Sequence, residues 1–182
     1  MLFRCTLQEG VELRLVEEQD AQELFELTDR NRAHLREWLP FVDNTRTTFD
    51  SLSFIKMGRR QISDNQGGQF VILVDDKIAG CVGFHGIDWN NRSTSIGYWL
   101  AQEYTGRGLM TLATEALCKL AFENYNLNRV EIRVATENYK SQAIPERLGF
   151  TREGVLRQRE WLYDHYVDHI VYSQLASEWK KS

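Results

Sequence analysis

One junction limits the possible folds more than any other feature: a strand-like run at residues 93–101 leads through Gly106-Arg107-Gly108 into an amphipathic segment. From Leu109 to Tyr125 the apolar side chains recur at positions i, i+3 and i+4, which places them on one face of a helix. The sequence therefore predicts a helix over residues 109–125 that buries one face and begins directly behind a glycine turn.

The glycine turn itself favours anion binding. Two glycines separated by one residue allow a tight turn that exposes successive backbone N–H groups, and the helix behind them adds a partial positive charge. The chain has no G-x-x-x-x-G-K-[ST] sequence, and Gly106-Arg107-Gly108 lacks the third glycine and the later acidic residue of a dinucleotide fingerprint. A kinase and an NAD enzyme are thus disfavoured, while the turn itself still suits an anion such as a pyrophosphate. The alternative is that the glycines have only a conformational role.

Hydrophobic periodicity predicts the other elements of the chain. Strands are expected at residues 11–15, 69–76, 77–88, 93–101 and 129–134, followed by two more up to about residue 175. Helical spacing occurs at residues 21–38, as one broken helix or two short ones, at 49–62, and in a short segment before Leu148-Gly149-Phe150. This order indicates an α/β (α+β) fold in which helices cover a mixed sheet. No linker divides the 182 residues, so residues 1–182 are expected to form one domain.

Composition and charge argue against several classes of protein. No stretch approaches the roughly 18 uncharged residues of a membrane helix, and the N-terminal segment has no long apolar core, so a cytoplasmic protein is expected. Cys5, Cys81 and Cys118 lie far apart without C-x-x-C spacing, which argues against disulfides and structural zinc. A net charge of −4 without a basic stripe argues against direct nucleic-acid binding and is compatible with a basic protein partner.

Four segments, taken in order, resemble the GNAT superfamily of N-acetyltransferases and, within it, the RimJ/RimL group that acetylates the N-terminal α-amines of ribosomal proteins. They are Arg36-Glu37-Trp38-Leu39-Pro40, Ile96-Gly97-Tyr98-Trp99-Leu100, Gly106-Arg107-Gly108-Leu109-Met110-Thr111, and Asn138-x-x-Ser141 followed by Arg147-Leu148-Gly149-Phe150. The resemblance covers nearly the whole chain. It implies the GNAT fold, with a mixed, mostly antiparallel seven-stranded sheet flanked by about four helices. Thr105 departs from the Gln or Arg of the general pattern, and Met110 from its Gly or Ala, although Met110 is familiar in the RimJ/RimL type.

The resemblance also implies acetyl-CoA as cosubstrate and a set of residues that bind it. In this family the fourth strand splays from the fifth and frees a backbone N–H for the thioester oxygen, and Trp99 and Leu100 are the expected donors here. The other residues expected to bind acetyl-CoA are Arg107, Gly108, Leu109, Met110, Thr111, Asn138 and Ser141. No metal is expected, because His85 and the pair His165 and His169 have no companion carboxylate motif.

Acetyl transfer to an amine requires one group that accepts the ammonium proton and another that supports the leaving thiolate. The resemblance assigns these roles to Glu160 and Ser141, since no tyrosine stands where many superfamily members have one. Glu160, flanked by arginines, could instead be a surface ion-pair member. Ser141 could instead cap the following helix, whose start Pro145 could shift. The weaker candidates for the base are Glu37, Asp43 and Asp168.

The function expected from this resemblance is acetyl transfer from acetyl-CoA to a primary amine, foremost the N-terminal α-amine of a ribosomal protein. An α-amine has a pKa of about 8 against about 10.4 for lysine, so roughly a tenth is neutral near pH 7 and a weak base suffices. A small-molecule amine acetyltransferase and a non-catalytic acyl-CoA-binding module are the alternatives. Related enzymes are often dimers, so a homodimer is compatible with the resemblance.

Overall fold

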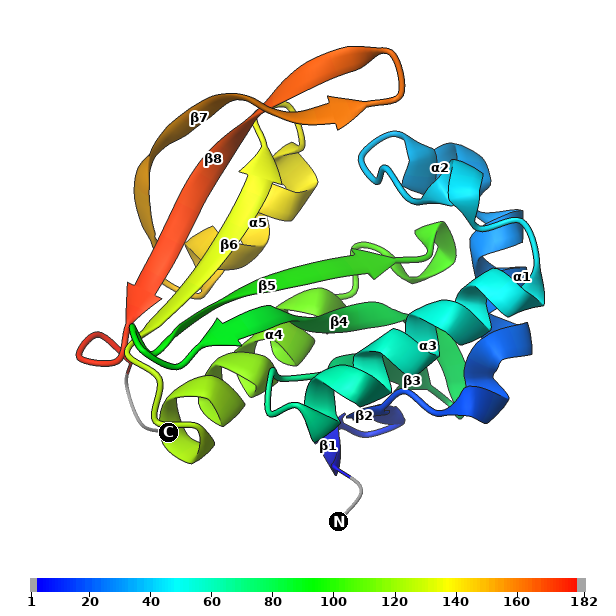
Figure 1. Cartoon of the computed structure of the whole chain (residues 1–182), viewed down its shortest axis with the longest axis horizontal. Helices are drawn as coiled ribbons and strands as arrows, with labels where there is room; N and C mark the ends of the chain where they lie inside the picture. The colour runs from blue at the N-terminus through cyan, green and yellow to red at the C-terminus, as the bar shows by residue number, and fades with distance from the viewer. Residues whose placement is uncertain (1–2, 180–182) are drawn as a thin grey trace.

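The computed structural model describes residues 3–179, which form one sheet of eight strands in the order β1-β2-β3-β4-β5-β6-β8-β7 (Figure 1). The strands are β1 (Arg4–Gln8), β2 (Val11–Leu15), β3 (Gln69–Val74), β4 (Lys77–Asp88), β5 (Ser93–Leu100), β6 (Arg129–Ala135), β7 (Thr151–Leu162) and β8 (His165–Leu175). Neighbouring strands pair antiparallel except β5 and β6, which run parallel. The predicted mixed, mostly antiparallel sheet is therefore confirmed.

The expected number of strands, seven, is one too few, because the sequence pattern did not reveal β1. Cys5 and Leu7 alternate with polar residues in this strand, but no residue of β1 is fully buried. β1 pairs only with β2, with Cys5 opposite Leu13, and Gly10 takes a φ of 70° in the turn between them. A short, half-exposed edge strand carries too few apolar residues to stand out by periodicity.

Helices cover both faces of the sheet (Figure 1). They are α1 (Ala21–Arg30), α2 (Arg32–Arg36), α3 (Thr48–Ser63), α4 (Leu109–Lys119) and α5 (Tyr139–Arg147). Alternate residues of β3 show the two layers, because successive side chains of a strand point to opposite faces. Phe70 and Ile72 pack in the core with residues of α4, whereas Val71 and Leu73 pack with residues of α1 and α3.

The structure confirms the helical predictions for residues 21–38 and 109–125. The break expected within residues 21–38 falls at Asn31, between α1 and α2. The buried Asn31 side chain donates to the carbonyl of Leu27 at 3.0 Å and accepts the backbone N–H of Gln102 at 2.9 Å, so it ties α1 to the segment before the glycine turn. The helix expected over 109–125 is α4, continued by a π-helical turn at Leu120–Asn124.

The two parallel strands pair over only part of their length. Their register runs from Ser93 opposite Arg129 to Ile96 opposite Ile132. Beyond that point β5 continues beside β4 and β6 continues beside β8, and Figure 1 shows the two strands diverging. The sheet is therefore open between residues 97–100 and 133–135, where each strand presents backbone groups to a gap instead of to its neighbour.

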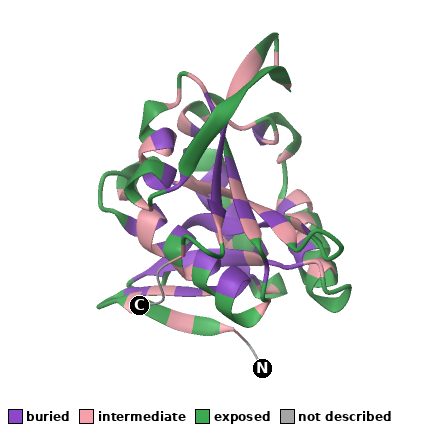
Figure 2. Ribbon diagram, turned by 90° about the vertical axis from the view of Figure 1, so that its left-hand side faces the viewer, coloured by how far each residue is buried: buried purple, intermediate pink, exposed green. Residues whose placement is uncertain are grey.

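The β7–β8 hairpin extends beyond the rest of the sheet, and residues 151–159 of β7 are all exposed (Figure 2). Between the pairs Leu156–His169 and Glu160–Val167, residues 157–159 of β7 face only Asp168 of β8. The Asp168 carboxylate accepts the backbone N–H of Gln158 at 2.7 Å, and Gln158 has a φ of 49°. Asp168 thus holds a bulge in which three residues of β7 oppose one of β8, and Glu160 is the first paired residue after it.

Candidate active site

A cleft of about 950 Å³ lies where β5 and β6 separate. Its floor includes the splayed ends of the two strands, and α1 and α3 contribute one side. The residue at the start of α5, Ser141, and the late-strand residue Glu160 both line it. We call the following residues, which also line the cleft, its outer wall: Trp38, Leu39, Pro40, Phe41, Arg159, Glu160 and Trp161.

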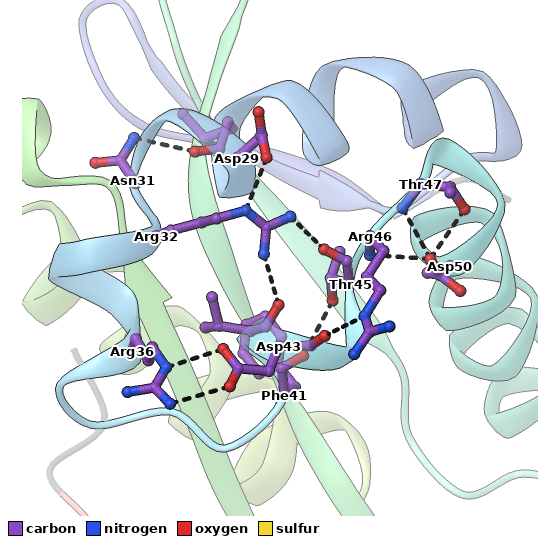
Figure 3. A network of polar contacts seen from close by, with 12 residues as sticks. Asp29, Asn31, Arg32, Arg36, Phe41, Asp43, Thr45, Arg46, Thr47 and Asp50 are labelled. Atoms are coloured by element: carbon purple, nitrogen blue, oxygen red, sulfur yellow. Dashed lines mark hydrogen bonds and ion pairs between the residues drawn. The ribbon is translucent and has the colours of Figure 1, made fainter. Parts of the chain in front are cut away.

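The two halves of the outer wall meet through Tyr163, at the tip of the β7–β8 hairpin. Its hydroxyl donates to the carbonyl of Leu39, and the Arg36 guanidinium lies 3.7 Å from the centre of its ring. Arg36 is held in turn by both carboxylate oxygens of Asp43, at 2.9 and 3.0 Å (Figure 3). The loop that carries residues 38–41 is therefore fixed at both ends before any acceptor arrives.

Further polar contacts stiffen the same loop (Figure 3). Arg32 donates to Asp29 and to the carbonyls of Val42 and Thr45. Asp50, at the first turn of α3, accepts the backbone N–H groups of Arg46 and Thr47. These bonds explain how an irregular segment can form part of a defined cleft wall.

The direction of the β5 backbone decides which N–H groups face the gap. Ala101 donates its backbone N–H to the carbonyl of Ala79 on β4. Along an antiparallel strand, residues that bond to the neighbouring strand alternate with residues whose N–H points away from it. The backbone N–H of Trp99, opposite Cys81, points towards β4 like that of Ala101. The N–H groups of Tyr98 and Leu100 point away from β4. Of the two donors expected from the sequence, Leu100 is thus the one whose N–H is directed at the gap between β5 and β6.

The glycine turn lies at the start of α4, with Gly108 as the residue that precedes the helix. Gly106 and Gly108 have φ values of 76° and 74°, which L side chains adopt rarely. A Cβ added at either glycine would meet no atom within 4 Å, so the requirement for glycine is conformational. The same empty space leaves room for a ligand to approach the backbone.

The residues around the two glycines differ in how far their side chains are exposed. Leu109 and Met110 are buried in the core, so only their backbone N–H groups can serve a ligand. Arg107 is exposed, with its guanidinium 5.8 Å from the centre of the Tyr104 ring, and Thr111 is half-buried. The Thr105 hydroxyl donates to the carbonyl of Gln102 at 2.8 Å, which is a contact within the turn.

Asn138, and not Ser141, caps α5. The Asn138 side chain accepts the backbone N–H of Ser141 at 3.2 Å, so the expectation that Ser141 could be the cap is wrong. Nor does Pro145 shift the start of the helix, because it lies inside α5. The Ser141 hydroxyl is therefore free for another contact, and it donates to the Tyr98 hydroxyl at 3.3 Å. Sequence reasoning missed Tyr98 because it approaches Ser141 from β5 and not from the chain around α5.

Glu160 lies beside a histidine inside the cleft. Its Oε2 is 3.4 Å from Nε2 of His169, and both residues line the cleft. His85, on the floor, has Nδ1 3.1 Å from the Ser95 hydroxyl. Partial desolvation in the cleft and the charge of Arg133 lower the pKa of His85, while Glu160 acts in the opposite direction, and the net shift favours the neutral ring.

The other sequence-based candidates lie outside the cleft. Glu37 is exposed at the end of α2, and Asp43 is paired with Arg36. Asp168 holds the β7 bulge, and His165 contacts the neighbouring Asp164 at 2.6 Å in the hairpin turn. Within residues 3–179, no group of three His, Cys, Asp or Glu side chains is arranged to hold a metal ion. Among the same residues, no helix is long and apolar enough to span a membrane.

A glycine turn at the start of α4, a gap between β5 and β6, and an acidic residue and a hydroxyl in the cleft at that gap fit an acyl-coenzyme A-dependent transferase. A family model described as an acetyltransferase (GNAT) domain matches residues 11–151. The chain belongs to the GNAT family of acetyltransferases, and acetyl-CoA is its acetyl donor.

Individual relatives extend the match to the full length. The chain is 38% identical to the putative ribosomal N-acetyltransferase YdaF of Bacillus subtilis over 98% of each protein. It is 29% identical to the ribosomal-protein-serine acetyltransferase of Escherichia coli, over 92% of this chain and 93% of the relative. It is also similar to the crystal structure of the microcin C7 self-immunity acetyltransferase MccE in complex with acetyl-CoA and AMP, with a TM-score of 0.87, 29% identity, and coverage of 93% of this chain and 94% of that one.

Proposed function

We propose that this acetyltransferase modifies the N-terminal α-amine of a protein, and specifically of a ribosomal protein. The observation that carries the proposal is the position of Glu160 and Ser141 in one cleft, at the gap between β5 and β6. The names of the B. subtilis and E. coli relatives, which refer to ribosomal acetylation, support the choice of acceptor.

The chemistry assigned to the cleft starts from the protonated amine. Glu160, directly or through one water, accepts a proton from the ammonium, and the neutral nitrogen attacks the thioester carbonyl carbon. The new N–C bond forms as the C–S bond breaks, the nitrogen gives up its second proton to solvent to become the neutral amide, and coenzyme A leaves as a thiolate. The Ser141 hydroxyl, which donates to Tyr98 in the free protein, turns its proton to that sulfur, and the thiolate, whose thiol has a pKa near 8.5, is protonated by solvent.

Acetyl-CoA would be held mainly by backbone groups. In this proposal the N–H groups of residues 107–111 bind the pyrophosphate at the start of α4, aided by the helix dipole. The Leu100 N–H, directed at the gap, binds the thioester oxygen, and Trp99 contributes its side chain to the cleft. Asn138 contributes by capping α5 and so fixing Ser141.

The Glu160–His169 contact suits an amine that needs only a weak base. Because an α-amine has a pKa near 8, part of it is already neutral near pH 7, and a weak base suffices. His169 lies 3.4 Å from the Glu160 carboxylate and helps to hold it in the cleft.

An acceptor panel tests the proposal. Coenzyme A release is measured with acetyl-CoA and peptides that begin with Ser or Ala, with a polyamine, and with free amino acids. We expect the peptides to react with a kcat/KM at least tenfold above any small amine. Faster reaction of a small amine would make that compound class the substrate, and no coenzyme A release with any amine would support a non-catalytic binding module.

A further inference from the structure

Pro145 leaves one carbonyl of α5 without its usual partner. In an α-helix the carbonyl of residue i accepts the N–H of residue i+4, and Pro145 is four residues after Ser141. Proline has no N–H, and its ring also crowds the carbonyl four residues earlier. The Ser141 carbonyl must therefore find a donor outside the helix or remain unpaired.

Tyr98 supplies that donor from the opposite side of the gap. Its hydroxyl donates to the Ser141 carbonyl at 3.1 Å and accepts the Ser141 hydroxyl at 3.3 Å. Burial raises the pKa of Tyr98, so the phenol stays protonated and able to donate throughout the working pH range. One phenol thus contacts both oxygen atoms of Ser141.

The position of Tyr98 gives this contact a mechanical consequence. Tyr98 lies on β5 beyond Ile96, the last residue of β5 that pairs with β6. Its bonds to Ser141 connect β5, which presents the Leu100 N–H, to the first turn of α5. The Leu100 N–H and the Ser141 hydroxyl are the two groups assigned to the thioester. The distance between them therefore depends on the bonds that Tyr98 makes to Ser141.

We propose that Tyr98 is a positioning residue whose hydroxyl replaces the helix hydrogen bond that Pro145 cannot make, and so fixes Ser141 relative to β5. The catalytic part of this inference rests on the proposed role of Ser141 in acetyl transfer. The structural part, a coupling between Tyr98 and Pro145, holds whatever the acceptor is.

A double-mutant cycle separates the two parts. Tyr98→Phe removes the donor, Pro145→Ala restores a backbone N–H at residue 145, and the double variant has the helix bond without the phenol. Tyr98→Phe is expected to lower Tm by about 3–6 °C, because a partly buried carbonyl loses its partner. In the Pro145→Ala background the same change should lower Tm by less than half as much. Equal losses of Tm in both backgrounds would overturn the coupling.

Activity is measured on the same four proteins with acetyl-CoA and a Ser-terminal peptide. We expect Tyr98→Phe to lower kcat about tenfold with little change in peptide KM, and the double variant to return within about threefold of Pro145→Ala. A double variant that regains Tm but not kcat would overturn the positioning role and make the phenol a direct participant. Because the Tm cycle needs no substrate, failure of the proposed function would show as no activity in any of the four proteins, wild type included.

Tyr172→Phe is the matched control. Like Tyr98, Tyr172 is a tyrosine on a strand, and its hydroxyl donates to α5 at the Glu146 carboxylate, 3.0 Å away. This variant removes a tyrosine contact to the same helix without touching Ser141. Its kcat should equal that of the wild type. A tenfold loss of kcat in Tyr172→Phe would mean that any loosening of α5 lowers kcat, and would overturn the specific role of Tyr98.

Discussion

The glycine turn and the outer wall of the cleft are built in opposite ways. The glycine turn is a few consecutive residues whose backbone faces open space, with Gly106 and Gly108 in the left-handed region. The outer wall joins residues 38–41 to residues 159–161, and a hairpin-tip contact from Tyr163 holds its halves together. One region needs a backbone conformation, whereas the other needs particular side chains brought from distant parts of the chain.

This difference determines how each region should respond to substitution. At the glycine turn, any residue that accepts a positive φ can preserve function, because no side chain is used. In the cleft, a change of one functional group on an intact backbone should be enough to slow one chemical step. The four predictions below test this contrast.

The largest effect is expected for Glu160→Gln, which keeps the shape of the side chain and removes its basicity. We expect kcat to fall about 100-fold at pH 7 with coenzyme A affinity unchanged, and to recover in part as pH rises and the amine deprotonates unaided. Steady-state kinetics across pH 6 to 9 and calorimetry measure both quantities. Glu37→Gln, an exposed carboxylate outside the cleft, is the control. Full kcat of Glu160→Gln across this range would show that Glu160 is only a surface charge.

At the glycine turn, Gly108→Val should weaken acetyl-CoA binding about 30-fold, equivalent to about 2 kcal/mol, because the φ of 74° is strained for a β-branched residue. Gly108→Asn is the matched variant, since Asn tolerates this conformation and its Cβ meets no atom within 4 Å. It should bind within about threefold of the wild type by calorimetry. Equal losses in both variants would mean that a side chain there blocks the ligand directly.

Ser141→Ala should lower kcat about tenfold, a smaller loss than at Glu160, because the hydroxyl supports a leaving group that solvent can also protonate. Raising the pH should not restore the rate, since the role of Ser141 follows the attack. The pH profile separates this variant from Glu160→Gln. A rescue by high pH as complete as that of Glu160→Gln would place Ser141 on the proton path from the amine.

The smallest effect concerns the base of the hairpin that carries Glu160. There Arg129 of β6 reaches Glu153 of β7 at 2.6 Å, and Ser173 of β8 donates to the same carboxylate. The Arg129 guanidinium, with Ser173, lowers the pKa of Glu153 from 4.5 to about 2. The stabilisation is therefore fully present above pH 4.5 and is lost as pH falls towards 2.

Glu153→Gln removes that pH dependence. Because the Glu153 side chain is 41% exposed, solvent screening limits the loss at pH 7 to about 1 kcal/mol or less. Thermal melts should show wild type and variant converging between pH 4.5 and 2. A difference in Tm that persists undiminished at pH 2 would mean that Glu153 acts through packing and not through its charge.

The sequence predicted the regions that depend on local pattern and missed those that depend on long-range contacts. Helix α4, the strands β3, β4 and β5, and the glycine turn follow from periodicity and glycine spacing, and the structure confirms their places. The short edge strand β1 has too weak a pattern to be recognised. The α5 cap, weighed as Ser141, is Asn138, because capping depends on which side chain turns towards the N–H groups of the helix.

Side-chain partners were the least predictable. Asp168, considered a possible base, holds the β7 bulge, and nothing in its neighbours along the chain indicates that Gln158 will donate to it. The Tyr98–Ser141 contact joins residues 43 positions apart. The proline inside α5 was the available signal, because a helix that contains proline has a carbonyl in need of another donor.

The central claim, that the enzyme acetylates an α-amine, is tested most directly by competition within one molecule. A peptide with a free N-terminal Ser and one internal lysine is incubated with enzyme and acetyl-CoA at pH 7, and tandem mass spectrometry locates the acetyl group. The account predicts that at least nine-tenths of early product carries it on the N-terminus, since the α-amine is neutral far more often than the lysine. A second peptide with its N-terminus blocked should react at least tenfold more slowly. Acetyl-lysine as the main product of the first peptide would contradict the account.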